Sequence, residues 1–174
     1  ARNAEMQTIL NVKIKKRESF RPFAPVIKFD KLKEWFDWDD ESPYMLFTAS
    51  ITENKMIKSE SELIGLKKLH ETRSLIQSVT HIDYSSRIQT VTEESNPILY
   101  KLLDAYENLT GCPVLINTSF NQRGEPIVNT PSDAFQCFMR TEMDVLVLGH
   151  RLLLKAEQPS TPVEHSQRHN YELD

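Results

Sequence analysis

An α/β fold with a twisted, mixed β-sheet flanked by helices is predicted by three features of the 174-residue sequence. Short apolar or alternating segments, typical of strands, are interspersed with segments whose apolar residues recur at helical spacing. Apolar residues make up 39% of the chain, which is enough to bury a core. The sequence has no heptads, internal repeats or low-complexity tracts. We therefore predict an α/β fold, at the border with α+β, as one domain over residues 1–155 followed by a polar tail over 156–174.

The elements of the first half follow from the spacing of apolar residues. A short helix is predicted in the first dozen residues, a strand at Val26-Ile27, and a helix through Lys31–Phe36 that Asp30 caps. The further predicted elements are a buried strand over 44–51, a polar loop over 53–61, a helix from Leu63 to His70, and two strands over 78–83 and 87–91.

The second half has clearer boundaries. Asn96-Pro97 opens a helix whose broad apolar stripe runs from Ile98 to Leu109 and ends at Gly111. A core strand over 113–116 follows, and residues 130–133 begin another helix with proline in its first turn. Residues 145–148 and 151–154 predict a hairpin, after which the chain from 156 onward is predicted to fray.

Composition narrows the function. The formal net charge of −4 argues against general binding to nucleic acid or to an anionic membrane. No apolar run reaches the ~18 residues that a membrane-spanning helix needs, and the polar start is no signal peptide. Cys112 and Cys137 stand among apolar neighbours and predict buried, reduced, inert thiols. We therefore expect a cytoplasmic protein.

Positive charge is concentrated near the start, where residues 1–33 hold nine basic and three acidic side chains. One interpretation is a solvated helix face or a nuclear-type basic patch. The other is an anion site, because Lys15, Arg17 and Arg21 are interleaved with Phe and Pro residues. A proline restricts the residue before it, so Arg21 is pushed toward an extended conformation that suits a phosphate or carboxylate clamp.

A second polar segment, residues 117–126, directly follows the predicted core strand. Asn117, Ser119, Asn121 and Arg123 supply amide, hydroxyl and guanidinium donors without an evident base. Ligands favour the carboxyl ends of strands in open sheets, which favours a binding site here. An ordinary polar turn with Gly124 at positive φ is the alternative.

Two further pairs are predicted to line a pocket. His81 and Asp83 alternate on one predicted strand, and Arg87 and Gln89 share a face of the next. A hydrogen-bonded, non-catalytic His81 is the simpler interpretation of the first pair. Arg87, predicted as half-buried, needs an anionic partner.

Other familiar sites are not indicated. The His, Cys, Asp and Glu residues show no metal-ligand spacing, and the sequence has no glycine-rich phosphate loop and no nucleophile motif. If phosphates bind this chain, side-chain cations must hold them.

Three segments, followed by Asp133-Ala134 and residues 145–149, resemble the carboxyl-terminal domain of the NodU/CmcH-type O-carbamoyltransferases. They are KIKKRESFRPFAP (13–25), HIDYSSRIQTV (81–91) and LTGCPVLINTSFNQRGEPIVNTP (109–131). The resemblance implies a YrdC-like domain that binds ATP and carbamoyl phosphate and makes carbamoyl adenylate. It also implies a preceding actin-like ATPase-fold domain in the same protein, which carries a metal such as iron and the acceptor site, so this chain looks like an excised domain.

The resemblance also implies roles for particular residues. YrdC-like proteins carry Lys-x-Arg and Ser-x-Asn signatures, which match Lys15-Lys16-Arg17 and Ser119-Phe120-Asn121. The phosphates would be neutralised by side-chain cations, the carbamoyl or α-phosphate oxygens would be oriented by polar groups, and Mg²⁺ would arrive with the nucleotide. The expected cations are Lys15, Arg17, Arg21, Arg87 and Arg123, and the expected polar groups are Gln89, Asn117, Ser119 and Asn121.

Other functions stay open at this point. A YrdC-like module could bind nucleic acid through Lys13–Arg21, although the net charge makes this unlikely on the sequence. A threonylcarbamoyl-AMP synthase-type enzyme and a non-catalytic docking remnant are two further alternatives. A homodimer is a further alternative for the assembly.

Overall fold

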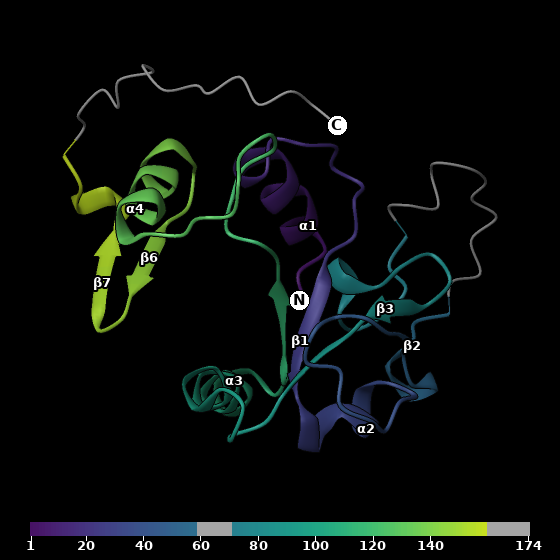
Figure 1. The fold of residues 1–174 in the computed structure, drawn as a ribbon. Helices are drawn as coiled ribbons and strands as arrows, with labels where there is room; N and C mark the ends of the chain where they lie inside the picture. The colour runs from purple at the N-terminus through teal and green to yellow at the C-terminus, as the bar shows by residue number, and fades with distance from the viewer. Residues whose placement is uncertain (59–70, 160–174) are drawn as a thin grey trace. The chain divides into compact units, whose positions relative to one another are not determined.

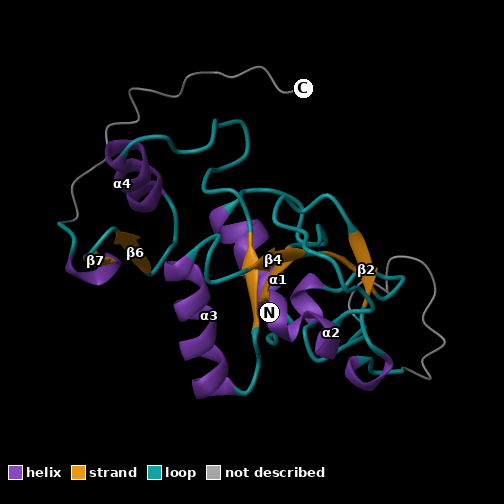
Figure 2. Cartoon of the chain, turned by 60° about the horizontal axis from the view of Figure 1, so that its bottom comes forward, coloured by secondary structure: helices purple, strands orange, loops and turns teal. Residues whose placement is uncertain are grey.

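The computed structural model describes residues 1–58 and 71–159 (Figure 1). These described residues form two compact units: residues 1–7 with 20–58 and 71–118, and residues 8–19 with 119–159. Helices and strands alternate along the chain, and the strands are short with long loops between them (Figure 2). The predicted α/β class is confirmed.

A three-stranded mixed sheet is the centre of the first unit, with β1 between β4 and β5. β1 (Ala24–Lys28) is buried along its whole length, pairs in parallel with β4 (Gln89–Val91) and pairs antiparallel with β5 (Val114–Asn117). A central strand is covered on both faces, which explains why its sequence is continuously apolar until Lys28. A second, two-stranded sheet joins β2 (Thr48–Ser50) to β3 (Ser85–Arg87).

α3 (Pro97–Thr110) packs against β1 and β5 of this sheet. The Asn96 side chain accepts a hydrogen bond from the Leu99 N–H, and Gly111 ends the helix at φ 69°, so both predicted boundaries are confirmed. Leu103 is fully buried against Val26 and Val91. Only part of the broad apolar stripe is buried, because Ile98, Leu102 and Leu109 are exposed.

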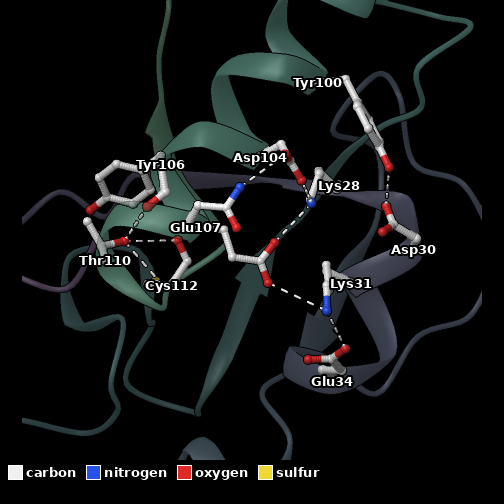
Figure 3. A network of polar contacts seen from close by, with 11 residues as sticks. Lys28, Asp30, Lys31, Glu34, Tyr100, Asp104, Tyr106, Glu107, Thr110 and Cys112 are labelled. Atoms are coloured by element: carbon white, nitrogen blue, oxygen red, sulfur yellow. Dashed lines mark hydrogen bonds and ion pairs between the residues drawn. The ribbon is translucent and has the colours of Figure 1, made fainter.

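A network of charged and polar side chains joins β1 to α3 at the end of the strand (Figure 3). The Lys28 Nζ lies 2.7 Å from Asp104 Oδ1 and 2.9 Å from Glu107 Oε2, and its side chain is only 4% exposed. Burial opposes the charge on Lys28, but these hydrogen bonds outweigh burial and raise its pKa. Asp30 accepts a hydrogen bond from the Tyr100 hydroxyl, so its predicted helix cap is wrong. The helix that follows is α2 (Leu32–Trp35), entered through a 3₁₀ turn over Phe29–Lys31.

Two predicted strands of this unit are wrong. The segment over 44–51 is a strand only at β2, because Met45 has a positive φ of 57° and Tyr44 and Leu46 are exposed. The segment over 78–83 is a 3₁₀ turn (Gln77–Val79) followed by a bend, and the predicted strand over 87–91 is split at Ile88 between two sheets. The loop over 53–58 contains a 3₁₀ turn (Glu53–Lys55). The predicted helix at 63–70 lies outside the described residues.

The second unit packs α4 (Pro131–Arg140) against a hairpin of β6 (Val145–Leu148) and β7 (Arg151–Leu154) (Figure 1). Phe138, Ala134 and Leu146 form its core. Thr130 and Asp133 form a reciprocal capping box at the start of α4, as the sequence predicts. The hairpin is confirmed. Lys155–Glu157 form a 3₁₀ turn, so the fraying predicted from 156 is wrong at its start, and residues 160–174 lie outside the described residues.

α1 (Glu5–Ile9) continues as a π-helical segment over Leu10–Ile14, which confirms the predicted helix in the first dozen residues. π-Helical turns often mark functional sites, because the extra residue redirects the side chains that follow. Here Lys15 is the residue that caps the end of the π-helical segment, and Lys16 takes a positive φ of 53°. The chain therefore turns sharply within the basic segment.

Candidate functional site

The Lys15 ammonium is the centre of a polar cluster within the second unit. Its Nζ contacts four oxygens: Ser119 O at 2.6 Å, Asn121 Oδ1 at 2.7 Å, Asn121 O at 2.9 Å and Ser119 Oγ at 3.1 Å. Lys15 is 4% exposed, and all four oxygens are uncharged. The structure thus brings together the Lys-x-Arg and Ser-x-Asn signatures that the sequence places about a hundred residues apart.

Backbone and side-chain hydrogen bonds hold the two segments of this cluster together. The Arg123 N–H donates to the Lys15 carbonyl at 3.1 Å, and the Asn121 amide donates to the Glu125 carbonyl at 2.7 Å. The Ser119 hydroxyl donates to Asn121 Oδ1 at 2.6 Å. The loop at 119–125 is therefore fixed on the basic segment, and the alternative of an independent polar turn does not describe it.

Asn11 holds the basic segment, residues 15–21, in place through hydrogen bonds, and sequence reasoning missed it. It is fully buried, its amide donates to the Ser19 carbonyl at 3.0 Å, and its Oδ1 accepts a hydrogen bond from Arg17 Nε at 2.6 Å. Arg17 is thereby held beside the Lys15 cluster. The available signal was a single amide inside the apolar run Leu10-Asn11-Val12, since a buried amide must be hydrogen-bonded.

The electrostatic environment of Lys15 is unusual for a lysine. Burial, followed by the nearby Arg17 charge, lowers the pKa of Lys15 from 10.5 to about 8. Arg123 reaches Glu18 at 3.3 Å in an exposed ion pair, so part of its charge is compensated. The cluster accordingly holds a buried cation whose own contacts include no carboxylate.

The remaining predicted site residues belong to the first unit. Asn117 donates a hydrogen bond to Gln89 Oε1, and Gln89 donates to the Pro43 carbonyl at 2.9 Å, so these two amides contact each other. Arg87 and Gln89 do not share a face of one strand, because they lie in different sheets. Arg87 is exposed, so the argument from a half-buried guanidinium is wrong. Arg21 is exposed as well.

His81 and Asp83 are not on a strand, yet both line one pocket of the first unit. Across the described residues, no group of three or more His, Cys, Asp or Glu side chains is placed to hold a metal ion. Nor does any helix within 1–58 and 71–159 combine the length and apolar character required to cross a lipid bilayer. The side chains that the Lys15 cluster itself brings together are cations, amides and a hydroxyl.

Comparison with known proteins identifies the class to which this arrangement belongs. The family described as Carbamoyltransferase C-terminus matches residues 1–155, and the chain belongs to this family. The resemblance to the NodU/CmcH-type carbamoyltransferases is thereby confirmed.

Several curated relatives are similar over most of this chain. The uncharacterized protein sll1178 of Synechocystis is 49% identical over 99% of the chain, and the nodulation protein NolO of Bradyrhizobium diazoefficiens is 35% identical over 88%. The 3'-hydroxymethylcephem-O-carbamoyltransferase of Amycolatopsis lactamdurans is 36% identical over 77%. The matches span only 29%, 26% and 22% of these relatives, respectively, so the chain corresponds to a minor part of each.

Proposed function

We propose that this chain is the part of an O-carbamoyltransferase that binds ATP and carbamoyl phosphate and forms carbamoyl adenylate. A further domain of the same protein would then transfer the carbamoyl group to a hydroxyl of a small molecule. The observation that carries the proposal is the buried Lys15 ammonium among uncharged oxygens, in a chain of the carbamoyltransferase family.

An anionic ligand would supply the negative charge that the contacts of Lys15 do not provide. A buried cation without a carboxylate is costly, and a second cation, Arg17, adds repulsion. A phosphate oxygen near Lys15 removes both costs at once, and hydrogen bonds between charged groups are about twice as strong as neutral ones. Bound phosphate is therefore expected to stabilise the charged form of Lys15.

The contacts of Lys15 support this proposal, because they leave room for an anion to replace one of them. An ammonium has three hydrogens, but four oxygens lie within 3.1 Å, so at least one contact is shared. Ser119 Oγ is the longest of the four and already donates its own hydrogen to Asn121. Replacing this contact by a phosphate oxygen leaves the other three in place, and Ser119 itself is exposed.

The reaction proposed here needs charge neutralisation and orientation rather than a protein nucleophile. Hydrolysis of carbamoyl phosphate releases phosphate and carbamate, and a carbamate oxygen then attacks the α-phosphorus of ATP while pyrophosphate leaves. Lys15, Arg17 and Arg123 would neutralise the phosphates, and Ser119 and Asn121 would orient the reacting oxygens. Mg²⁺ would accompany the nucleotide. Arg21, Arg87, Gln89 and Asn117 stay sequence-based candidates for the same ligands.

Pyrophosphate release from ATP and Mg²⁺, with and without carbamoyl phosphate, tests the proposal. We expect release that requires both substrates and that Lys15→Met lowers by about 100-fold, because one preorganised donor is worth roughly 3 kcal/mol. Lys13→Met is the matched control, since Lys13 is exposed and forms an exposed ion pair with Glu142 at 3.4 Å. Equal rates for the two variants, or release without carbamoyl phosphate, would contradict it.

Calorimetric binding of Mg·ATP separates recognition from turnover. If this chain binds ATP without releasing pyrophosphate, the chemistry depends on the further domain while the anion site stands. Wild-type affinity in Lys15→Met would remove Lys15 from the site in either case.

A further inference from the structure

A pocket of about 440 Å³ in the first unit has no part in the proposed adenylation cluster. Phe20, Pro22 and Ile82 give it an apolar wall, and Gln7, His81 and Asp83 add polar side chains. Phe20 and Ile82 are each about half exposed, at 52% and 51%. Its volume falls in the range of small-molecule sites, which combine apolar walls with a few fixed polar groups.

The hydrogen bonds around Ser85 determine which nitrogen of His81 carries the proton. Ser85 Oγ lies 2.7 Å from Asp83 Oδ1, and because a carboxylate can only accept, the hydroxyl hydrogen goes to Asp83. The 3.2 Å contact between Ser85 Oγ and His81 Nδ1 then requires that Nδ1–H donates. Burial is the main cause that lowers the pKa of His81, so the ring is neutral at pH 7 and Nε2 is an acceptor.

Gln7 and Asp83 each have an acceptor left as well. Both hydrogens of the Gln7 amide are used, on the carbonyls of Phe20 and Arg21 at 3.0 Å each, so Oε1 is left to accept. Asp83 Oδ1 accepts two hydrogen bonds from Ser85, which lower the pKa of Asp83 and keep it ionised. The second carboxylate oxygen of Asp83, Oδ2, is the third acceptor of the pocket, beside His81 Nε2 and Gln7 Oε1.

Three acceptors beside an apolar wall restrict the ligand. A phosphate or carboxylate would face the negative charge of Asp83 and two further acceptors, and Arg73, which contributes the guanidinium of this lining, is buried at 4% exposure. A wholly apolar ligand would leave the acceptors without the hydrogen bonds they make in water. A ligand with an apolar ring face and several O–H donors satisfies both parts of the pocket.

We infer that this pocket binds an uncharged, polyhydroxylated ring of the sugar type. One face of the ring packs on Phe20 and Ile82, and its hydroxyls donate to Gln7 Oε1, His81 Nε2 and Asp83 Oδ2. The inference does not depend on carbamoyl adenylate formation, because the pocket lies wholly in the first unit and uses no residue of the Lys15 cluster.

Ligand-observed NMR titration of the 174-residue chain tests the inference, with methyl β-D-glucopyranoside as the probe. Tetrahydropyran, the same ring without hydroxyls, is the matched control probe. We expect saturable binding of the glucoside and at least tenfold weaker binding of tetrahydropyran. Absence of saturable glucoside binding, or equal binding of the two probes, would overturn the inference.

Two substitutions localise the binding to this pocket. Asp83→Asn removes the charged acceptor and should weaken glucoside binding at least tenfold, because a hydrogen bond to a charged group is the strongest of the three. Phe20→Ala should weaken it also, and truncating a half-exposed ring leaves the core intact. Asp39→Asn, a change of an exposed carboxylate in the same unit, should have no effect. Unchanged binding in both pocket variants, with wild-type circular dichroism, would refute the assignment.

Discussion

Raising the pH from 7 to 9 tests the Lys15 charge without altering any atom around it. Burial and Arg17 lower the pKa of Lys15 to about 8. The charged fraction therefore falls from about nine-tenths at pH 7 to about one-tenth at pH 9, whereas an ordinary lysine stays charged throughout. If the ammonium holds a phosphate of ATP, the association constant should fall about tenfold per pH unit above 8, up to the higher pKa of the bound state.

Calorimetric titration with Mg·ATP at a series of pH values measures this slope. Lys15→Arg keeps its charge over the whole range, so its affinity should not vary with pH, whatever its absolute value. Lys15→Met should bind weakly and also without the slope. A wild-type affinity that is constant from pH 7 to 9, or a Lys15→Met variant that retains the slope, would refute the role of this ammonium.

The same pKa shift has a consequence for stability whose sign can be worked out. Because the folded-state pKa lies below the unfolded value of 10.5, the unfolded chain binds more protons between pH 8 and 10.5. Lys15 therefore destabilises the fold below pH 8, and this cost disappears as the pH rises toward 10.5. At 1.36 kcal/mol per pKa unit the change is at most about 3 kcal/mol, measured as the wild-type minus Lys15→Met difference in unfolding free energy.

Three further predictions concern stability and reactivity. Lys28→Met should lower the free energy of unfolding in urea by about 2 kcal/mol, because Asp104 and Glu107 lose the buried cation between them. Lys33→Met is the control: its ion pair is exposed, so the free energy of unfolding should change by less than about 0.5 kcal/mol. Equal effects would contradict the network. Thr130→Ala should cost about 1 kcal/mol through the lost cap, and Thr130→Ser should restore most of it. Cys112 and Cys137 should label slowly in the native protein, because burial raises both thiol pKa values; rapid labelling would contradict this.

Helix boundaries could be predicted from the sequence because their determinants are local. Asn96 and Gly111 delimit α3, and Thr130 with Asp133 opens α4, each through hydrogen bonds or φ values within a few residues. Burial could not be predicted in the same way. The apolar stripe of α3 is wider than the face that meets the sheet, so Leu103 is buried while Leu109 is 86% exposed.

Strand prediction failed where pairing, rather than sequence pattern, decides the structure. The apolar run from Tyr44 to Ile51 pairs with β3 only over three residues, and Met45 interrupts it with a positive φ. His81 and Asp83 were expected to meet by alternation on a strand. They meet instead because both hydrogen-bond to Ser85 across a bend, a contact that no periodicity encodes.

The sequence indicated three of the side chains that meet in the Lys15 cluster, but not the residue that supports them. Lys15, Ser119 and Asn121 are indicated by their motifs, and the structure joins them through direct contacts. The buried Asn11, which orders Arg17 and the turn after Lys15, was missed because an amide in a helical segment is usually assumed to face solvent. Tertiary burial is the information that distinguishes the two cases.

Two lysines that are buried within the described residues, 1–58 and 71–159, show how contacts separate structural from functional charge. Lys28 and Lys15 are 3% and 4% exposed, so burial alone does not distinguish them. The charge of Lys28 is matched by Asp104 and Glu107, which raise its pKa, and no external anion is needed there. Lys15 is surrounded by neutral oxygens, and its pKa falls. A phosphate should therefore shift the pKa of Lys15 upward on binding and leave that of Lys28 unchanged, which ¹⁵N-detected lysine titration can resolve; an unshifted Lys15 would place the phosphate elsewhere.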